Sequence, residues 1–255
     1  MSRRPLVAGN WKMNPASAEE AVALARDVAA RVAGLSPLTV LCPPTIWLAA
    51  VAEAVTGQQV RIGAQTTAAE ESGAYTGETS PLMLRGLAEF AIIGHSERRR
   101  LYGETDDDVR DKVASAVAHG IRPIAAVGER LAERHAGRTA EVVERQTRAA
   151  IGRLQRIAGT GLVMAYEPVW AIGTGEAATD ADAQEASARI RAILAELDPT
   201  GAEEVPILYG GSVTADNAGR FFAQPDVDGA LVGGASLQAV GFAAIVAAAA
   251  RVSTR

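Results

Sequence analysis

Short runs of apolar residues alternate along this chain with longer stretches in which apolar residues recur at helical spacing. Eight of the runs have the length of strands and are nearly continuous in apolar residues, with few polar positions between them. They span residues 5–9, 38–41, 59–64, 90–94, 121–127, 162–166, 206–209 and 229–232. Continuous apolar strands are typical of a parallel sheet that is buried on both faces.

Amphipathic stretches follow these runs and predict helices over residues 17–32, 45–55, 105–118, 129–157, 180–197, 215–222 and 237–251. Ser17 is a favoured N-cap residue for the first of them. A long polar segment, residues 65–80, follows the third run instead. Eight strand–helix units in 255 residues give about 32 residues per unit, the spacing of a (β/α)8 barrel. We therefore predict an α/β protein with a single barrel domain over residues 1–255.

A doubly wound parallel sheet is the alternative architecture for such a pattern. It is disfavoured because no G-x-G-x-x-G motif follows the first strand. No linker, low-complexity segment or change of composition divides the chain.

The composition is that of a globular protein, with 48% hydrophobic and 22% charged residues. A net charge of -5 gives no global positive field that would attract nucleic acid. Cys42 is the only cysteine, so an internal disulfide is excluded. The longest apolar run, residues 242–250, is too short to span a bilayer, and we expect a cytoplasmic protein without a membrane partner.

The active site of a (β/α)8 barrel lies at the carboxyl ends of its strands, so the residues that follow the strands are the candidates. Polar, titratable and glycine residues gather at these positions, which packing alone does not explain. They are Asn10, Lys12, His95, Glu97, Glu167, Gly210, Gly211, Ser212, Gly233 and Gly234. No Asp, Glu and His cluster has metal-ligand spacing and no Walker loop is present, so we expect neither a metal nor nucleotide hydrolysis.

Glu167 directly follows an apolar strand and precedes a segment of small residues with two glycines, residues 168–175. A base on a rigid strand beside a segment able to close is what proton transfer sheltered from water requires. An ordinary strand–helix loop with a surface glutamate is the alternative reading of this stretch by itself. In the same way, Lys12 could be a solvated surface lysine and His95 a satisfied core histidine, but their places at strand ends favour a role in the site.

Two glycine pairs follow consecutive strands, at Gly210-Gly211 and Gly233-Gly234. Each pair alone could be a tight turn. Together they match a phosphate site in which backbone N–H groups approach an anion closely. The sequence therefore predicts a phosphorylated substrate, with Ser212 in the same turn and Gly173 as a further N–H donor.

Six blocks of the sequence resemble the triosephosphate isomerase family, and they occur in the family's order over nearly the whole chain. The blocks are residues 9–14 (GNWKMN), 73–78 (GAYTGE), 94–99 (GHSERR), 166–175 (YEPVWAIGTG), 209–213 (YGGSV) and 233–237 (GGASL). The chain departs from the family pattern at Ala126, where cysteine is common, and at Thr66, where asparagine is usual. Neither position carries a catalytic role in the family.

The resemblance implies interconversion of dihydroxyacetone phosphate and D-glyceraldehyde 3-phosphate, a glycolytic and gluconeogenic step, without a cofactor. It implies that Glu167 is the base, that neutral His95 polarises the carbonyl, that Asn10 and Lys12 contact the substrate, and that Glu97 supports this network. Phosphate contacts are implied for Gly173, Ser212, Gly233 and Gly234. A lid is implied over Pro168, Val169, Trp170, Ala171, Ile172, Gly173, Thr174 and Gly175. Thr76 lies in a loop that contacts a second subunit in the family, which implies a homodimer.

Two other functions remain open at this point. An isomerase of a related sugar phosphate, such as a tetrulose phosphate, could keep every residue named, because pocket volume sets the length of the substrate. A barrel that binds a phosphorylated sugar without turning it over is the second alternative, although an intact Glu167 and His95 argue against it.

Overall fold

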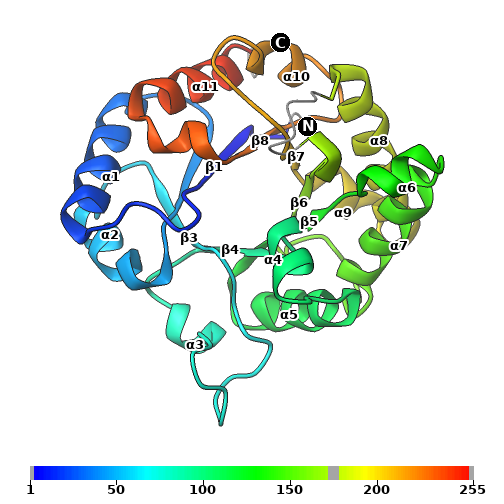
Figure 1. Ribbon diagram of the computed structural model, residues 1–255, viewed down its shortest axis with the longest axis horizontal. Coiled ribbons are helices and arrows are strands. Elements are labelled where there is room, and N and C mark those ends of the chain that lie inside the picture. The colour runs from blue at the N-terminus through cyan, green and yellow to red at the C-terminus, as the bar shows by residue number, and fades with distance from the viewer. Residues whose placement is uncertain (1–2, 172–177, 253–255) are drawn as a thin grey trace.

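Eight parallel strands form a closed barrel in the order of the sequence, with each strand paired to its two neighbours (Figure 1). A computed structural model describes residues 3–171 and 178–252. The strands are β1 (Leu6–Asn10), β2 (Leu38–Cys42), β3 (Arg61–Ala64), β4 (Phe90–Ile93), β5 (Arg122–Val127), β6 (Val163–Tyr166), β7 (Ile207–Tyr209) and β8 (Gly229–Val232). β1 pairs with both β2 and β8, which closes the barrel. The predicted (β/α)8 barrel is confirmed.

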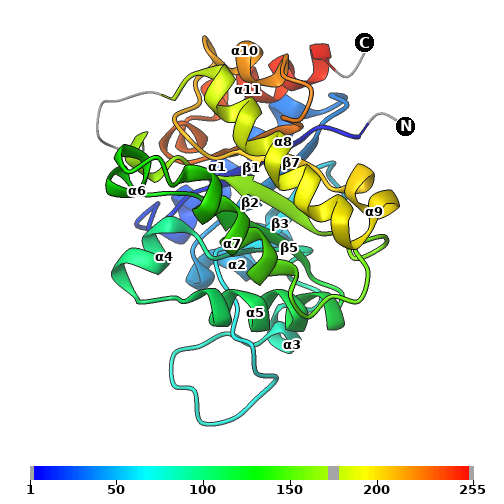
Figure 2. The ribbon, with the colours of Figure 1, turned by 90° about the vertical axis from the view of Figure 1, so that its right-hand side faces the viewer.

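Helices surround the barrel as an outer ring (Figure 1). The α-helices are α1 (Ala18–Val32), α2 (Leu48–Ala54), α3 (Pro81–Leu84), α4 (Ser96–Leu101), α5 (Asp106–Ala118), α6 (Leu131–His135), α7 (Thr139–Ile151), α8 (Asp180–Leu197), α9 (Pro199–Glu204), α10 (Ala218–Phe222) and α11 (Ala239–Val252). Short 3-10 helices are η1 (Thr45–Trp47), η2 (Val169–Ala171) and η3 (Gly234–Leu237). Figure 2 shows α4 and α6 at one end of the barrel and α9 at the other. No helix among the described residues is long and apolar enough to cross a membrane.

The apolar strands are buried on both faces, as their composition predicts. Alternate strand residues fill the barrel interior, and Phe90, Ile92, Ile124 and Leu231 belong to this inner cluster. The intervening residues, such as Val7, Leu41 and Ile93, pack outward against the helices in a second and larger cluster. Side chains on a strand point alternately to opposite faces, so a strand with a core on each side must be apolar throughout.

Three short helices were missed by the sequence pattern, which reads their residues as turns or loops. In α4 the sequence Ser-Glu-Arg-Arg-Arg-Leu shows no apolar periodicity, and its N-cap is His95, whose side chain accepts a hydrogen bond from Glu97 N. α9 begins with Pro199 after Asp198, whose carboxylate accepts from Gly201 N. α3 likewise has Pro81 after the cap Ser80. In all three, the side-chain cap marks the start of the helix more clearly than hydrophobicity does.

Glu104, which follows α4 in the chain, holds the end of β4 in place. Its side chain is almost fully buried and accepts hydrogen bonds from Lys112 Nζ at 2.6 Å and Arg98 Nε at 3.1 Å. The second carboxylate oxygen accepts from Gly94 N at 2.9 Å, directly before His95. Burial raises the pKa of Glu104, but the contacts with Lys112 and Arg98 together outweigh burial and lower the pKa below its ordinary value of 4.5.

We expect Glu104→Gln to lower the free energy of unfolding at pH 7 by roughly 3–5 kcal/mol, because two cations lose their buried partner. The pKa of Glu104 is depressed in the folded state, so its stabilisation is present above pH 4.5 and is lost as the pH falls through the folded-state value. The difference between wild type and variant should therefore shrink at acid pH. Urea denaturation at fixed protein concentration measures it, with the exposed Glu53→Gln as control. A difference that stays constant from pH 7 to pH 3 would contradict this role.

Candidate active site

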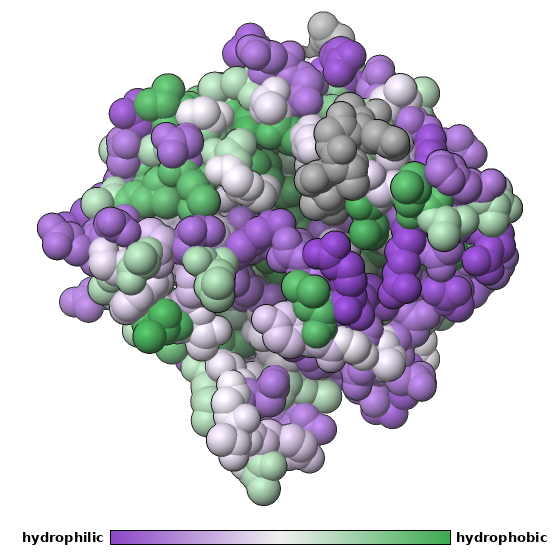
Figure 3. Space-filling model, viewed as in Figure 1, coloured by the Kyte–Doolittle hydropathy of each residue, from purple (hydrophilic) through white to green (hydrophobic). Residues whose placement is uncertain are grey.

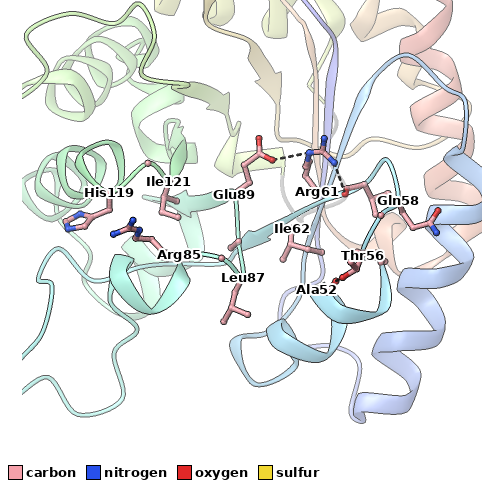
Figure 4. A pocket seen from close by; sticks show the side chains of 16 residues that line it. Ala52, Thr56, Gln58, Arg61, Ile62, Arg85, Leu87, Glu89, His119 and Ile121 are labelled. Atoms are coloured by element: carbon pink, nitrogen blue, oxygen red, sulfur yellow. Dashed lines mark hydrogen bonds and ion pairs between the residues drawn. The ribbon is translucent and has the colours of Figure 1, made fainter.

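A hollow of about 340 Å³ lies at the carboxyl ends of the strands. It gathers residues that the sequence analysis selected from five strand ends: Asn10, Lys12, His95, Glu167, Gly210, Gly211, Ser212, Gly233 and Gly234. A second hollow of about 500 Å³ lies where β3, β4 and β5 begin, at the opposite end of the barrel (Figure 4). There Arg61 is paired with Glu89 at 3.1 Å, so these charges neutralise one another. The first hollow is the candidate active site.

Glu167 is held rigidly although it lies just beyond β6. Only 2% of the residue is exposed, and its backbone N–H donates to Val127 O at 2.8 Å. Two glycines leave the space it occupies. A Cβ on Gly128 would lie 1.7 Å from Glu167 O, and a Cβ on Gly210 would lie 2.8 Å from Glu167 Cγ. Neighbouring strands therefore need glycine at these two positions for the carboxylate to sit in the hollow.

The carboxylate of Glu167 contacts the end of β4 through both of its oxygens. Oε1 lies 3.0 Å from His95 Nε2, and Oε2 accepts a hydrogen bond from Ser96 N at 2.8 Å. Burial raises the pKa of Glu167, but the contacts with His95, Ser96 N and Lys12 lower it below its ordinary value. The carboxylate is therefore the ionised form, which can accept a proton.

The hydrogen bonds of His95 define which ring nitrogen carries a proton. Nδ1 accepts from the backbone N–H of Glu97 at 3.2 Å, so the proton of a neutral ring lies on Nε2 and points to Glu167. Burial lowers the pKa of His95, while the charges of Glu167 and Glu97 raise it above its ordinary value. A second proton on Nδ1 would face the Glu97 N–H, and on this geometry we assign the neutral ring.

Lys12 has a strained backbone that places its ammonium group in the hollow. Its φ is +52°, which makes it the one non-glycine residue of the described chain with a positive φ. Asn10 Oδ1 accepts from Lys12 N at 3.0 Å, and Gln65 Nε2 donates to Lys12 O at 2.7 Å and to Cys42 O at 2.9 Å. The side chain extends to Glu97, with Nζ 2.5 Å from Oε1.

The glycine turns after β7 and β8 line the hollow beside Lys12. A Cβ on Gly233 would lie 3.4 Å from Lys12 Cε and 3.9 Å from Nζ, so the ammonium group is next to this turn. Ser212 follows Gly210-Gly211 and its hydroxyl donates to Ala171 O at 3.5 Å. Backbone N–H groups of glycine turns together with an ammonium group are suited to bind an anion such as phosphate.

The predicted lid, residues 168–175, is described only in part. Val169–Ala171 forms η2, and Trp170 Nε1 donates to Glu129 Oε1 at 2.8 Å. The Arg134 guanidinium lies 4.0 Å from the centre of the Trp170 ring. Gly173, with Ile172, Thr174 and Gly175, lies outside the described residues, so its predicted phosphate contact is untested.

Three contributions to the site escaped the sequence analysis. The N–H of Ser96, the side chain of Gln65 and the buried carboxylate of Glu129 each hold a predicted site element in place. Gln65 directly follows β3 and Ser96 comes three residues after the end of β4, and these positions were the available signal. Glu129 follows β5 after Gly128 in the same way. Within the described residues, no group of three or more His, Cys, Asp or Glu side chains could hold a metal ion.

Comparison with known proteins matches this chain to one family. A family model described as triosephosphate isomerase matches residues 5–249. A protein named triosephosphate isomerase from Moorella thermoacetica is 51% identical over 252 residues, covering 96% of this chain and 98% of that protein. Proteins of the same name from Herpetosiphon aurantiacus and Shewanella amazonensis are 50% and 49% identical, and the matches cover 96% and 94% of this chain and 98% and 95% of those proteins.

Proposed function

The chain belongs to the triosephosphate isomerase family, and from this premise we propose that its site interconverts dihydroxyacetone phosphate and D-glyceraldehyde 3-phosphate. The observation that supports the proposal most is the pair of Glu167 and His95. An ionised carboxylate and a ring N–H, 3.0 Å apart, line a hollow that also contains an ammonium group and two glycine turns. This set supplies a base, an electrophile and an anion site.

The proposed reaction begins when Glu167 takes a proton from the carbon next to the substrate carbonyl. The electron pair of that C–H bond forms the carbon–carbon double bond of an enediolate, while His95 Nε2–H hydrogen-bonds to the oxygen that gains charge. Return of a proton to the adjacent carbon gives the isomer. Both oxygens of Glu167 are engaged by Ser96 N and His95, so the carboxylate exchanges these contacts for the substrate.

Lys12 and Asn10 are proposed to bind the substrate and stabilise its negative charge. Glu97 holds the Lys12 ammonium group from one side and, through its backbone N–H, the His95 ring from the other. Gly233, Gly234 and Ser212 are proposed as phosphate contacts. The role of residues 168–175 as a lid, and of Gly173 within it, remains a prediction from the family resemblance.

A coupled assay on both triose phosphates tests the proposal directly. We expect turnover without added metal or cofactor, and kcat/KM well above that for a four-carbon ketose phosphate. A preference for the four-carbon substrate would overturn the assignment in favour of a related isomerase. Binding without turnover would favour a barrel that only holds phosphorylated sugars.

Gln65 offers a test of the proposed role of Lys12. Gln65→Met keeps the length of the side chain but removes both hydrogen bonds to Lys12 O and Cys42 O. We expect KM to rise up to about tenfold, because a hydrogen bond contributes roughly 0.5–1.5 kcal/mol and the strained Lys12 backbone is released. We expect kcat to fall less, since Glu167 and His95 keep their contacts. Unchanged constants, as in the exposed control Gln58→Met, would show that Lys12 is positioned by other contacts.

We also propose a homodimer of single-domain subunits, with Thr76 at the contact. Residues 65–80 project from the barrel next to α3 (Figures 1 and 2) and carry the exposed Thr76. Large apolar side chains are exposed on the segments around β1–β4, in Met13, Ile46, Tyr75, Leu82, Met83, Leu101 and Tyr102. The viewed face in Figure 3 shows several separate hydrophobic residues above the projection. Only a contiguous apolar patch marks an interface by itself, so the support for the dimer comes from the family resemblance of the loop that carries Thr76. Sedimentation equilibrium measures the mass of the protein in solution, and a mass of one 26.4 kDa chain would refute the dimer.

A cytoplasmic location remains an expectation from the sequence.

A further inference from the structure

Lysine is nearly absent from this chain, and the two lysines differ sharply in their surroundings. Lys12 and Lys112 stand among 25 basic residues. The Lys112 side chain is 12% exposed and its Nζ lies 2.6 Å from the buried carboxylate of Glu104. Lys12 Nζ is also paired, with Glu97 Oε1 at 2.5 Å, but the Lys12 side chain is 32% exposed and lines the active-site hollow. Lys12 therefore carries the accessible side-chain amine of the described chain.

The surroundings of Lys12 select for one kind of electrophile. Its amine lies beside Gly233, next to the turn proposed to bind phosphate. A small molecule that carries both a phosphate and an aldehyde would be held by the turns with its carbonyl near this amine. Proximity of this kind raises the rate of addition strongly. Guanidinium groups do not form imines, so the arginines that make up nearly all of the basic residues are not competing sites.

We propose that Lys12 is a covalent capture site for small phosphorylated aldehydes that the site does not turn over, a role that rests on the proposed phosphate turns. The ammonium group loses a proton to solvent and leaves Glu97, and its nitrogen then attacks the aldehyde carbon. A C=N bond replaces the C=O bond, and water leaves with the carbonyl oxygen. The imine removes the charge of Lys12 and fills the hollow, so capture inactivates the enzyme. Hydrolysis of the imine restores it.

Pyridoxal 5′-phosphate is a suitable probe, because it is a phosphorylated aldehyde that is not a substrate. Native protein is incubated with the probe, the imine is reduced with borohydride, and the labelled peptide is mapped by mass spectrometry. We expect label at Lys12 and not at Lys112, with loss of activity in proportion to the label. Inorganic phosphate should protect Lys12. Pyridoxal, which lacks the phosphate, should label Lys12 at least about tenfold more slowly than its phosphate does, as expected for the loss of charged hydrogen bonds.

Matched variants distinguish capture at Lys12 from unspecific reaction. Lys112→Arg should be labelled and inactivated like wild type, whereas Lys12→Arg should lose the label while keeping a cation. The α-amino group of the chain serves as an internal measure of unassisted labelling. Label at Lys112, or label at Lys12 no faster than at the α-amino group, would overturn the proposal. Equal rates with pyridoxal and its phosphate would also overturn it. The labelling outcomes do not depend on turnover of triose phosphates, so failure of capture at Lys12 and failure of the proposed function are separate results.

Discussion

Glu167→Asp should lower kcat by about 10²-fold, because shortening the side chain draws the carboxylate back by about 1 Å from its place in the hollow. The wild-type oxygen positions are set by His95 Nε2 at 3.0 Å and Ser96 N at 2.8 Å, and the backbone is fixed by its hydrogen bond to Val127 O. A Cβ on Gly128 or Gly210 would lie 1.7 or 2.8 Å from an atom of Glu167, so the residue has little free space in which to shift and compensate. We expect KM to change little, because the proposed phosphate contacts are not altered. Steady-state kinetics in both directions measure this.

The matched control for this variant is Glu53→Asp, an exposed carboxylate on α2. It should leave kcat and KM as in wild type. Glu167→Gln goes further, because it keeps the size of the side chain and removes the base, and its kcat should lie below that of Glu167→Asp. Turnover near the wild-type rate in either Glu167 variant would remove this residue from the role of base and point to another group in the hollow.

The architecture was predictable from sequence because every strand carries a core on each side. The eight apolar runs coincide with β1–β8, and only their ends differ, as where the third run begins at residue 59 and β3 at Arg61. The short helices α3, α4 and α9 were not predictable from hydrophobic spacing, since four to six residues do not complete two turns. Their starts depend on side-chain caps from Ser80, His95 and Asp198.

The site was predictable as a set of residues but not as a set of contacts. The barrel topology brings strand ends together, so Lys12, His95 and Glu167 could be assigned to one rim from their places after strands. Which backbone groups hold them depends on differences of a few tenths of an ångström in the spacing between segments far apart in the chain. Ser96 N on Glu167 joins residues 71 positions apart, and Gln65 on Lys12 joins residues 53 apart. In both contacts one partner is a backbone N–H or C=O group. Nearly every residue type carries these groups, so the residue type at that position does not predict the contact.

His95→Gln should lower kcat by roughly 10²–10⁴-fold, the range for a positioned group that transfers or shares a proton. The amide of glutamine can donate a hydrogen bond toward the substrate oxygen, so a role in simple binding would be largely preserved. It lacks the second ring nitrogen, Nδ1, through which Glu97 N fixes the imidazole as the N-cap of α4. An amide N–H is also a much weaker acid than an imidazole N–H facing a developing oxyanion. The exposed His135 at the end of α6 provides the control, and His135→Gln should be as active as wild type. If His95→Gln instead raised KM and kept kcat, His95 would bind substrate without stabilising the enediolate, and the electrophile would have to be Lys12 or Asn10.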